Sequence, residues 1–314
     1  MNDNEKEPKV IKTSIGGQAI IEGVMMRGPL LSAMSVRIQD GTIDTETWEN
    51  KGAEAWYKKT PFVRGVFNLV DSLLTGYKCL MKSAEKSGMD LEEEPTKFEK
   101  WLIAKFGDGM MKVISVFALV VGAFLAMLLF MVIPTYSVKF LDMLIPLGVF
   151  KTALEGLIKI AVFVGYLALV SKMPEIKRVF EYHGAEHKTI ACYEAGEELT
   201  AENVAKYRRF HPRCGTSFIL IVLVISIIVF SFVPWFSGIL RILIKLLLLP
   251  VVVCIAYEII KFAGRHDNAL TRIISAPGLW LQRLTTCEPD ASQIEVAIAS
   301  MLPVIPQKEG TDQW

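Results

Sequence analysis

The segment between Lys112 and Lys139 contains no charged side chain, and this feature constrains the fold most strongly. An α-helix rises about 1.5 Å per residue, so about 20 apolar residues cross the roughly 30 Å hydrocarbon core of a bilayer. The segment therefore predicts a first membrane span over residues 113–134. The chain as a whole, with 52% hydrophobic and 21% charged residues, is also more apolar than an ordinary soluble domain. We expect an integral membrane protein.

Three further apolar segments have nearly the length of a span, namely residues 154–171, 216–240 and 242–260. The segment 216–240 is uncharged throughout. The other two contain Glu155, Lys159, Lys245 and Glu258. We interpret these as residues that reach the membrane interface, where long side chains can keep their charge hydrated. The sequence thus predicts a mainly α-helical polytopic membrane protein with about four transmembrane helices.

Lysine and arginine residues are unevenly distributed around these spans. The central loop, residues 172–215, carries Lys172, Lys177, Arg178, Lys188, Lys206, Arg208, Arg209 and Arg213. The segments predicted on the opposite side of the membrane carry only Lys139, Lys151, Arg241 and Lys245. Because basic loops remain in the cytoplasm, we expect the central loop and both termini to be cytoplasmic. The N-terminus also lacks the apolar core of a signal peptide.

Residues 1–60 are predicted to form a small cytoplasmic region that contains β-structure. The sequence SIGGQAIIEGVMMRGP is punctuated by glycines, of which we interpret Gly16 and Gly17 as turn residues. Farther along, polar and apolar residues alternate around Asp40-Gly41, a dipeptide that favours a tight hairpin turn. A short antiparallel sheet is therefore expected here.

The predicted regions that flank the membrane spans are helical. Within residues 61–112, the apolar positions between Phe62 and Leu80 recur at helical spacing, which predicts an amphipathic helix on the membrane or on the helical bundle. An acidic linker ending at Pro95 follows it. Residues 263–314 are expected to form cytoplasmic helices, one of them held at the interface by Trp280. The remaining predicted regions are residues 113–171 and 216–262, each with two spans, and the loop 172–215.

The central loop contains the strongest chemical motif of the chain. In YHGAEHKTIACYE, His183, Glu186 and His187 stand at positions i, i+3 and i+4. On a helix these side chains share one face, so two imidazoles can bind one metal ion while the carboxylate reaches a metal-bound water. The spacing HxxEH also occurs in inverted zincins. The motif predicts a divalent metal site, with zinc as the ion and Glu186 as the catalytic general base.

A metal site of this kind needs a third protein ligand. The candidates are Glu194, His211, Cys214, and His266 together with Asp267. Glu194 lies near the same helical face as His187, and the others are predicted at the same membrane surface. We expect Cys214 to be a packing residue rather than a ligand, because an isolated cysteine usually acts as a small hydrophobe. The five cysteines form no CxxC pair, so neither a disulfide framework nor a thiolate zinc ribbon is expected.

A purely structural interpretation of the motif remains open. Histidines near a membrane often bind headgroups or cap helices, and a His-Glu pair at i, i+3 can be a solvated helix contact. Gly184, inside the motif, weakens a helix by up to about 1 kcal/mol. The sequence alone does not decide between a metal site and these contacts.

Several long strings resemble one bacterial family. They are IGGQAIIEGVMMRGP, PFVRGVFNLVDSLLTGYKCLMKSAE, YHGAEHKTIACYE, HPRCGTSFILIVLVISI and PGLWLQRLTTCEPDASQIEVAIASM. The chain is similar over residues 13–303 to the YqhQ-like (DUF1385) family of bacterial membrane proteins. The resemblance implies a metal-dependent enzyme of the bacterial plasma membrane, in which His183, Glu186 and His187 match the suspected metal motif.

Two classes of function follow. The first is a metal-dependent hydrolase that acts at the cytoplasmic membrane face on a lipid-linked or membrane-protein substrate. The second is a non-catalytic factor that assembles or regulates membrane proteins through the sheet and the amphipathic helix. The lipid bilayer is an expected partner of either, and a homo-oligomer is compatible with both. A net charge of +1 gives no reason to expect a nucleic acid. Transport is disfavoured, because no charge is expected at the middle of the membrane.

Overall fold

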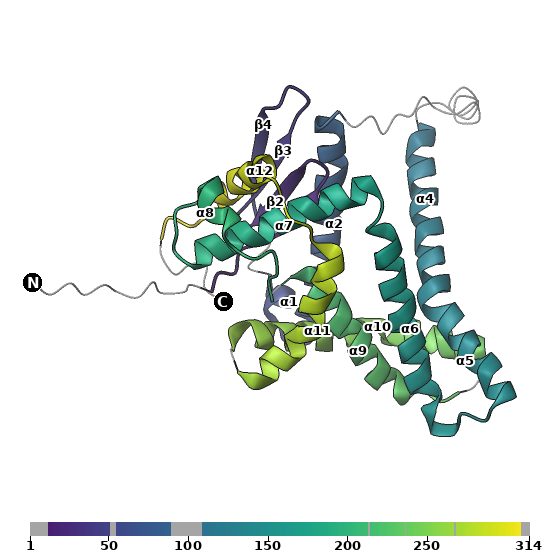
Figure 1. Ribbon diagram of the computed structural model, residues 1–314. Coiled ribbons are helices and arrows are strands. Elements are labelled where there is room, and N and C mark those ends of the chain that lie inside the picture. Colours follow the sequence, from purple (N-terminus) through teal and green to yellow (C-terminus); the bar gives the residue numbers. More distant parts are fainter. Residues whose placement is uncertain are drawn as a thin grey trace, which may run out of the picture. The chain divides into compact units, whose positions relative to one another are not determined.

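The structure is a computed structural model that describes residues 12–50, 55–88, 109–212, 214–235, 237–266 and 268–308 (Figure 1). The chain divides into two compact units. The sheet unit comprises Met1–Met89, Leu167–Val222 and Val253–Trp314. The helical unit comprises Asp90–Tyr166 and Leu223–Val252. The predicted acidic linker before Pro95 lies outside the described residues.

The sheet unit is built on a four-stranded antiparallel sheet in the order β1-β2-β3-β4. Its strands are β1 (Gly16–Ile20), β2 (Gly23–Arg27), β3 (Leu31–Arg37) and β4 (Ile43–Glu49). The hairpin predicted at Asp40-Gly41 is confirmed: Gly41 has a φ of +86°, and the Asp40 carboxylate accepts a hydrogen bond of 2.8 Å from the backbone N–H of Thr42. Gly16 and Gly17, predicted in a turn, instead belong to strand β1.

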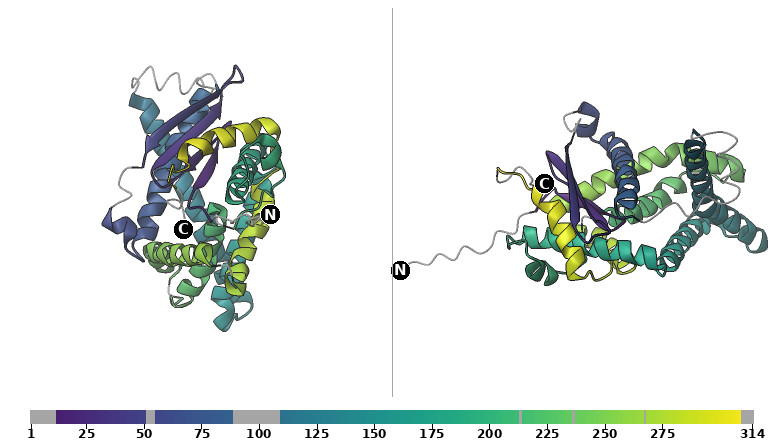
Figure 2. Two further views of the ribbon diagram at one scale, coloured as in Figure 1. Left: turned by 90° about the vertical axis from the view of Figure 1, so that its left-hand side faces the viewer. Right: turned by 90° about the horizontal axis from the view of Figure 1, so that it is seen from above.

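Helices cover both faces of this sheet. Their bounds are α2 (Arg64–Lys86), α7 (Pro174–Glu194) and α12 (Ala291–Met301). The side chains of a strand alternate between the two faces, so Val24 and Met26 pack in the core that includes α7 and α12, whereas Met25 packs on the side of α2. Figure 2 shows the sheet between these layers. The sheet therefore has two buried faces.

The predicted amphipathic helix is confirmed as α2. Cys79 faces the sheet, whereas Leu73, Leu74 and Tyr77 are each more than half exposed. The N-terminal end of α2 packs on α10 (Gly238–Arg265), and a Cβ at Gly65 would lie 2.9 Å from the Cα of Cys254. At this contact, Arg64 and Glu258 form an ion pair, and the predicted position of Glu258 at the membrane interface stays a prediction.

Five further elements are described here, of which α9 and α11 have 17 residues each and the other three have five or fewer. They are α1 (Trp56–Lys59), α8 (Ala201–Ala205), α9 (Gly215–Ser231), α11 (Ala269–Thr285) and η3 (Leu302–Val304). Helices α9 and α10 each contribute residues to both units. The loop between α8 and α9 supplies part of the site described below.

The helical unit contains α4 (Gly109–Met127), the π-turn η1 (Leu128–Val132), α5 (Ile133–Leu144), η2 (Gly148–Phe150) and α6 (Lys151–Val170). The first predicted span was expected to end at Pro134. The helix instead continues through it, because the π-turn lies immediately before the proline and accommodates its missing N–H.

Within the described residues, three stretches of helix are long and apolar enough to cross a membrane, namely Phe117–Leu144, Gly148–Val170 and Gly238–Arg265. The segment predicted as the clearest span, residues 216–240, forms a shorter apolar helix that ends at Ser231. Pro234 follows in the connection to α10, and it cannot donate the backbone hydrogen bond that a continuing helix needs. The predicted count of four spans is therefore not confirmed, and the predicted orientation of the termini stays a prediction.

The helical unit also buries charged side chains, which corrects the prediction that they reach the interface. Glu155 is 3% exposed and Lys245 is fully buried. The Glu155 carboxylate accepts hydrogen bonds from Lys245 and from the Thr135 hydroxyl at 2.5 Å, and an Arg241 nitrogen lies 3.0 Å from its other oxygen. Lys159 is likewise buried, with its ammonium 5.0 Å from the centre of the Phe230 ring. These residues pair between helices, so extension toward water is unnecessary.

Candidate metal centre

Helix α7 holds the HxxEH motif as predicted. Because α7 is regular from Pro174 to Glu194, His183, Glu186 and His187 lie on one face. Glu186 is 5% exposed and His187 is 1% exposed. The motif is therefore buried in the sheet unit, and the solvated helix contact that the sequence left open is excluded.

The glycine inside the motif has a packing role. A Cβ at Gly184 would overlap the carbonyl oxygen of Cys287, whose own N–H donates to the carbonyl of Phe180 at 2.8 Å. The chain that follows α11 thus runs directly against α7. Gly184 lowers the helix propensity of this segment slightly, but its lack of a Cβ allows the close approach.

Backbone carbonyls fix both imidazoles in the same manner. The Nδ1 of His183 lies 2.7 Å from the carbonyl oxygen of Thr285, and the Nδ1 of His187 lies 2.6 Å from that of Arg209. A carbonyl only accepts hydrogen bonds, so each Nδ1 carries the proton and donates it. In the neutral ring, each Nε2 then presents a lone pair. Metal-binding histidines in proteins are commonly oriented in this way, by a hydrogen bond from the ring nitrogen that does not bind the metal.

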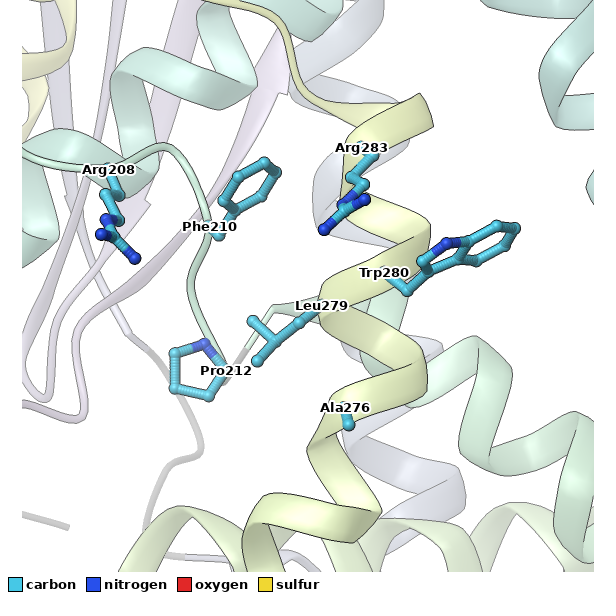
Figure 3. A pocket seen from close by; sticks show the side chains of 7 residues that line it. All are labelled: Arg208, Phe210, Pro212, Ala276, Leu279, Trp280 and Arg283. Atoms are coloured by element: carbon cyan, nitrogen blue, oxygen red, sulfur yellow. The ribbon is translucent and has the colours of Figure 1, made fainter.

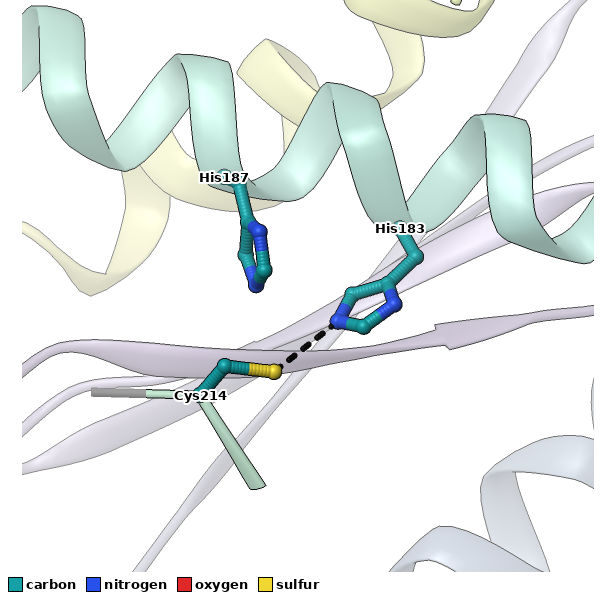
Figure 4. A group of neighbouring side chains, drawn as sticks. All are labelled: His183, His187 and Cys214. Carbon is teal, nitrogen blue, oxygen red and sulfur yellow. Dashed lines mark hydrogen bonds between the residues drawn. The ribbon is translucent and has the colours of Figure 1, made fainter. Parts of the chain in front are cut away.

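The two Nε2 atoms converge on Cys214, immediately before α9 (Figure 4). The Nε2 of His183 lies 3.1 Å from the Cys214 sulfur. The ligand atoms of His183, His187 and Cys214 all lie within 4.8 Å of one another. The Nε2 of His187 is buried and has no hydrogen-bond partner among the described residues. Cys214, predicted to be only a packing residue, is thus the third member of the cluster.

The cluster favours a charged thiolate and imidazolium pair. Burial opposes charge on Cys214, but the positive charges of His183 and His187 and the hydrogen bond with His183 lower its thiol pKa well below 9. Burial likewise opposes charge on His183, yet the negative charge of Cys214, a hydrogen bond to it and the charge of Glu186 raise the pKa of His183 to about 9. A thiolate is the form of cysteine that binds metals.

Glu186 completes the buried group. Burial raises its carboxyl pKa, although the nearby histidines and a hydrogen bond from the backbone N–H of Gly17 act in the opposite direction. Its Oε2 has no hydrogen-bond partner among the described residues. A Cβ at Gly17 would lie 2.9 Å from the carboxyl carbon of Glu186 and 2.6 Å from the carbonyl oxygen of Met25. Strand β1 therefore packs on Glu186 through the backbone of Gly17, which has no side chain.

Two of the other predicted ligands, His211 and Glu194, contact each other beside this group. The Nε2 of His211 lies 3.4 Å from an Oε of Glu194, and the second Oε of Glu194 accepts the N–H of Thr13 at 2.8 Å. The rings of His187 and His211 are 5.7 Å apart between centres. Neither His211 nor Glu194 belongs to the group of three converging ligand atoms.

His266 lies apart from this group. It is exposed at the end of α10, where it stacks on Phe262, and its Nδ1 lies 3.0 Å from the Phe262 carbonyl oxygen. Asp267, its predicted companion, lies outside the described residues. The structure thus brings together His183, Glu186 and His187 with Cys214, and it does not bring His266 to them.

Sequence analysis missed the residues that hold this arrangement from outside the motif. The side-chain amide of Gln282, on α11, accepts the N–H of His211 at 2.8 Å and donates to its carbonyl at 2.7 Å. Thr285, on the same helix, acts through its backbone carbonyl. A buried glutamine in an amphipathic helix is a detectable signal, whereas a backbone carbonyl leaves none.

The fold and the site together define a class of protein with apolar helices of membrane-spanning length and a sheet-covered cluster of two histidines, a cysteine and a glutamate. Residues 60–307 match the family described as "Protein of unknown function (DUF1385)". The chain belongs to this family. It is 36% identical over 294 residues to "Uncharacterized protein YqhQ" of Bacillus subtilis (strain 168), covering 92% of each chain. No solved structure matches. The cluster lies within the matched residues, whereas strands β1–β4 precede them.

Proposed function

We propose that His183, His187 and Cys214 bind a divalent transition-metal ion, with zinc as the ion that best suits these donors. The carrying observation is that both imidazoles are fixed at Nδ1 and present Nε2 to a thiolate. Zinc bonds of about 2.0 Å to nitrogen and about 2.3 Å to sulfur place tetrahedral ligands roughly 3.5 Å apart. The 3.1 Å between His183 Nε2 and the Cys214 sulfur is compatible with that spacing after a small adjustment. The buried, unpartnered Nε2 of His187 supports the same assignment.

The donor set supports a catalytic site more than a structural one. Structural zinc sites usually have four protein ligands, whereas catalytic sites keep one position open. Such an ion, when bound, lowers the pKa of bound water to about 7. We assign Glu186 as the general base, because its unpartnered oxygen lies beside the histidines and burial raises its carboxyl pKa. The proposed class is a metal-dependent hydrolase with a lipid-linked or membrane-protein substrate at the cytoplasmic membrane face.

Elemental analysis of the purified chain tests the metal. We expect stoichiometric zinc in the wild type and loss of it in His183→Ala combined with His187→Ala. Cys214→Ser should lose it as well. The matched control is His266→Ala, because this exposed histidine stands outside the cluster. Equal metal in the wild type and the double variant would remove the proposal.

The role of Glu186 needs a separate variant. Glu186→Gln should retain the metal while it abolishes the cellular function of the protein, measured by complementation of a deletion strain. A variant that keeps both the metal and the function would exclude Glu186 as the general base.

A second candidate function is supported by the exposed face of α2. Leu73 is 63% exposed and Leu74 is 58% exposed, which fits a non-catalytic factor that docks other membrane proteins on this helix. In that case Leu73→Gln with Leu74→Gln abolishes complementation, whereas Glu186→Gln leaves it intact. The metal-dependent enzyme requires the opposite result for Glu186→Gln.

A further inference from the structure

A cavity of about 540 Å³ lies beside the metal centre, within the sheet unit. One wall is the loop that carries Arg208, Phe210 and Pro212, and the other is helix α11 with Leu279 and Arg283. Figure 3 shows Leu279 and Arg283 pointing from α11 toward the loop. The lining is therefore apolar at its centre, with an arginine contributed by each wall.

Neither arginine of the cavity is neutralised. Arg208 and Arg283 are exposed, and neither has a hydrogen bond or an ion pair with any described residue. The neighbouring Arg209, in contrast, lies 3.4 Å from a carboxylate oxygen of Glu288. No acidic side chain lines the cavity. Two free guanidinium groups beside one cavity favour an anion with several acceptor oxygens, and phosphate groups match the fork of arginine donors.

The outer face of α11 indicates that this anion carries an apolar tail. Ile273 is 70% exposed, Leu270 is 57% exposed, and Trp280, which also lines the cavity, is 52% exposed. Helices with an apolar exposed side and basic residues lie at membrane interfaces, where tryptophan is enriched. A free phosphate would leave the apolar lining of the cavity without a partner.

The cavity also shares its walls with the metal centre. Phe210 and Pro212 flank His211, whose backbone is held by Gln282 of α11. The same loop leads to Cys214. A ligand between the loop and α11 therefore contacts the two elements that position the third metal ligand.

We propose that this cavity binds an anionic phospholipid, with its phosphate at Arg283 on the α11 wall and the start of its acyl chains along the apolar lining that includes Leu279, while Arg208 adds positive charge from the loop. Binding of the lipid does not depend on the metal. Its assignment as the substrate class of the site does rest on the proposed function, because the cavity lies beside the centre that would carry out the hydrolysis.

Calorimetric titration of the full chain in detergent tests this binding. The probe is dihexanoyl phosphatidylglycerol, compared with dihexanoyl phosphatidylcholine and with inorganic phosphate. We expect the wild type to bind phosphatidylglycerol at least about tenfold more tightly than either comparison compound. Arg208→Gln combined with Arg283→Gln should lose at least about tenfold in affinity. Arg265→Gln combined with Arg272→Gln removes the same charge outside the cavity and should lose none.

Several results would overturn the proposal. Equal affinity for phosphatidylcholine would show an apolar groove without headgroup recognition, and equal affinity for inorganic phosphate would show a free-anion site. An equal loss in the control pair would show unspecific attraction by surface charge. Failure of the metal site is distinguished by zinc analysis: the variant with Arg208→Gln and Arg283→Gln should keep its zinc, and wild-type protein stripped of zinc by a chelator should keep its lipid affinity.

Discussion

Two buried glutamates, one in each unit, have opposite environments. Glu155 in the helical unit is 3% exposed, and both of its oxygens are paired with donors from Thr135, Arg241 and Lys245. Glu186 in the sheet unit is 5% exposed, yet one of its oxygens has no partner among the described residues. Buried carboxylates normally have all their partners. The comparison indicates that Glu155 holds helices together, whereas Glu186 retains an oxygen for chemistry.

The largest expected effect comes from breaking the paired group. Glu155→Ala leaves Arg241 and Lys245 buried without their carboxylate, so we expect a loss of about 3–5 kcal/mol in the free energy of unfolding. Denaturant unfolding of the purified protein in detergent measures it. Glu175→Ala, an exposed residue in the first turn of α7, is the control and should change stability little. Similar small effects of both variants would show that the buried pairing does not stabilise the helical unit.

The next effect concerns the backbone that covers Glu186. Gly17→Ala places a methyl group against the Met25 carbonyl and the Glu186 carboxyl, so we expect a destabilisation of about 1–3 kcal/mol. At the adjacent Gly16 an added Cβ meets nothing within 4 Å, and Gly16→Ala is therefore the matched control. Thermal unfolding compares the two. If both variants melt together, strand β1 does not lie as closely on Glu186 as described.

Replacing the unpaired carboxylate itself should hardly change stability. Glu186→Gln keeps the shape of the side chain and removes a buried group that is incompletely paired, so we expect a change within about 1 kcal/mol. The same variant is expected to lose function, which makes it the reverse of Glu155→Ala. Denaturant unfolding and complementation, measured for the same variant, test whether function is lost while stability is kept. A large loss of stability would place Glu186 with Glu155 as a structural residue.

The smallest effect is expected at an exposed carboxylate. Glu46 on β4 forms ion pairs with Lys82 and Lys86 of α2, and hydrogen bonds from these two lysines lower its pKa. Because the folded-state pKa is depressed, the stabilisation is present above the unfolded pKa and is lost as the pH falls through the folded value. Solvent screens this pair, so Glu46→Gln should cost less than about 1 kcal/mol at neutral pH. Unfolding at pH 7 and below pH 4 checks it: the difference from the wild type should disappear in acid.

Sequence analysis predicted those parts of the molecule that depend on near neighbours. The hairpin at Asp40-Gly41, helix α2, and the shared face of His183 and His187 follow from turn chemistry and helical periodicity. The contact of Cys214 with His183 was not predicted, because it spans 31 positions and no local pattern encodes it. The burial of Glu155, Lys159 and Lys245 was missed for the same reason.

Glu155 and its partner Arg241 show the limit most clearly. Glu155 and Arg241 are 86 positions apart, and each alone resembles an interfacial charge in an apolar segment. Only the pairing of α6 with α10 reveals that they neutralise each other. Likewise, Gly17 looked like a turn glycine, because a sequence does not show which side chain will approach a strand.

The sheet is formed by residues near the N-terminus and is partly covered by α12, the last α-helix of the chain, and this order has a consequence for biosynthesis. Val24, Met26 and Ala33 form a buried core with α12, which begins only at Ala291. A ribosome therefore completes the sheet long before it delivers the helix that shields it. During this interval the nascent chain carries an uncovered apolar surface, which is prone to aggregation. A chain whose synthesis stops before Ala291 therefore lacks the helix that completes the cover of this face of the sheet.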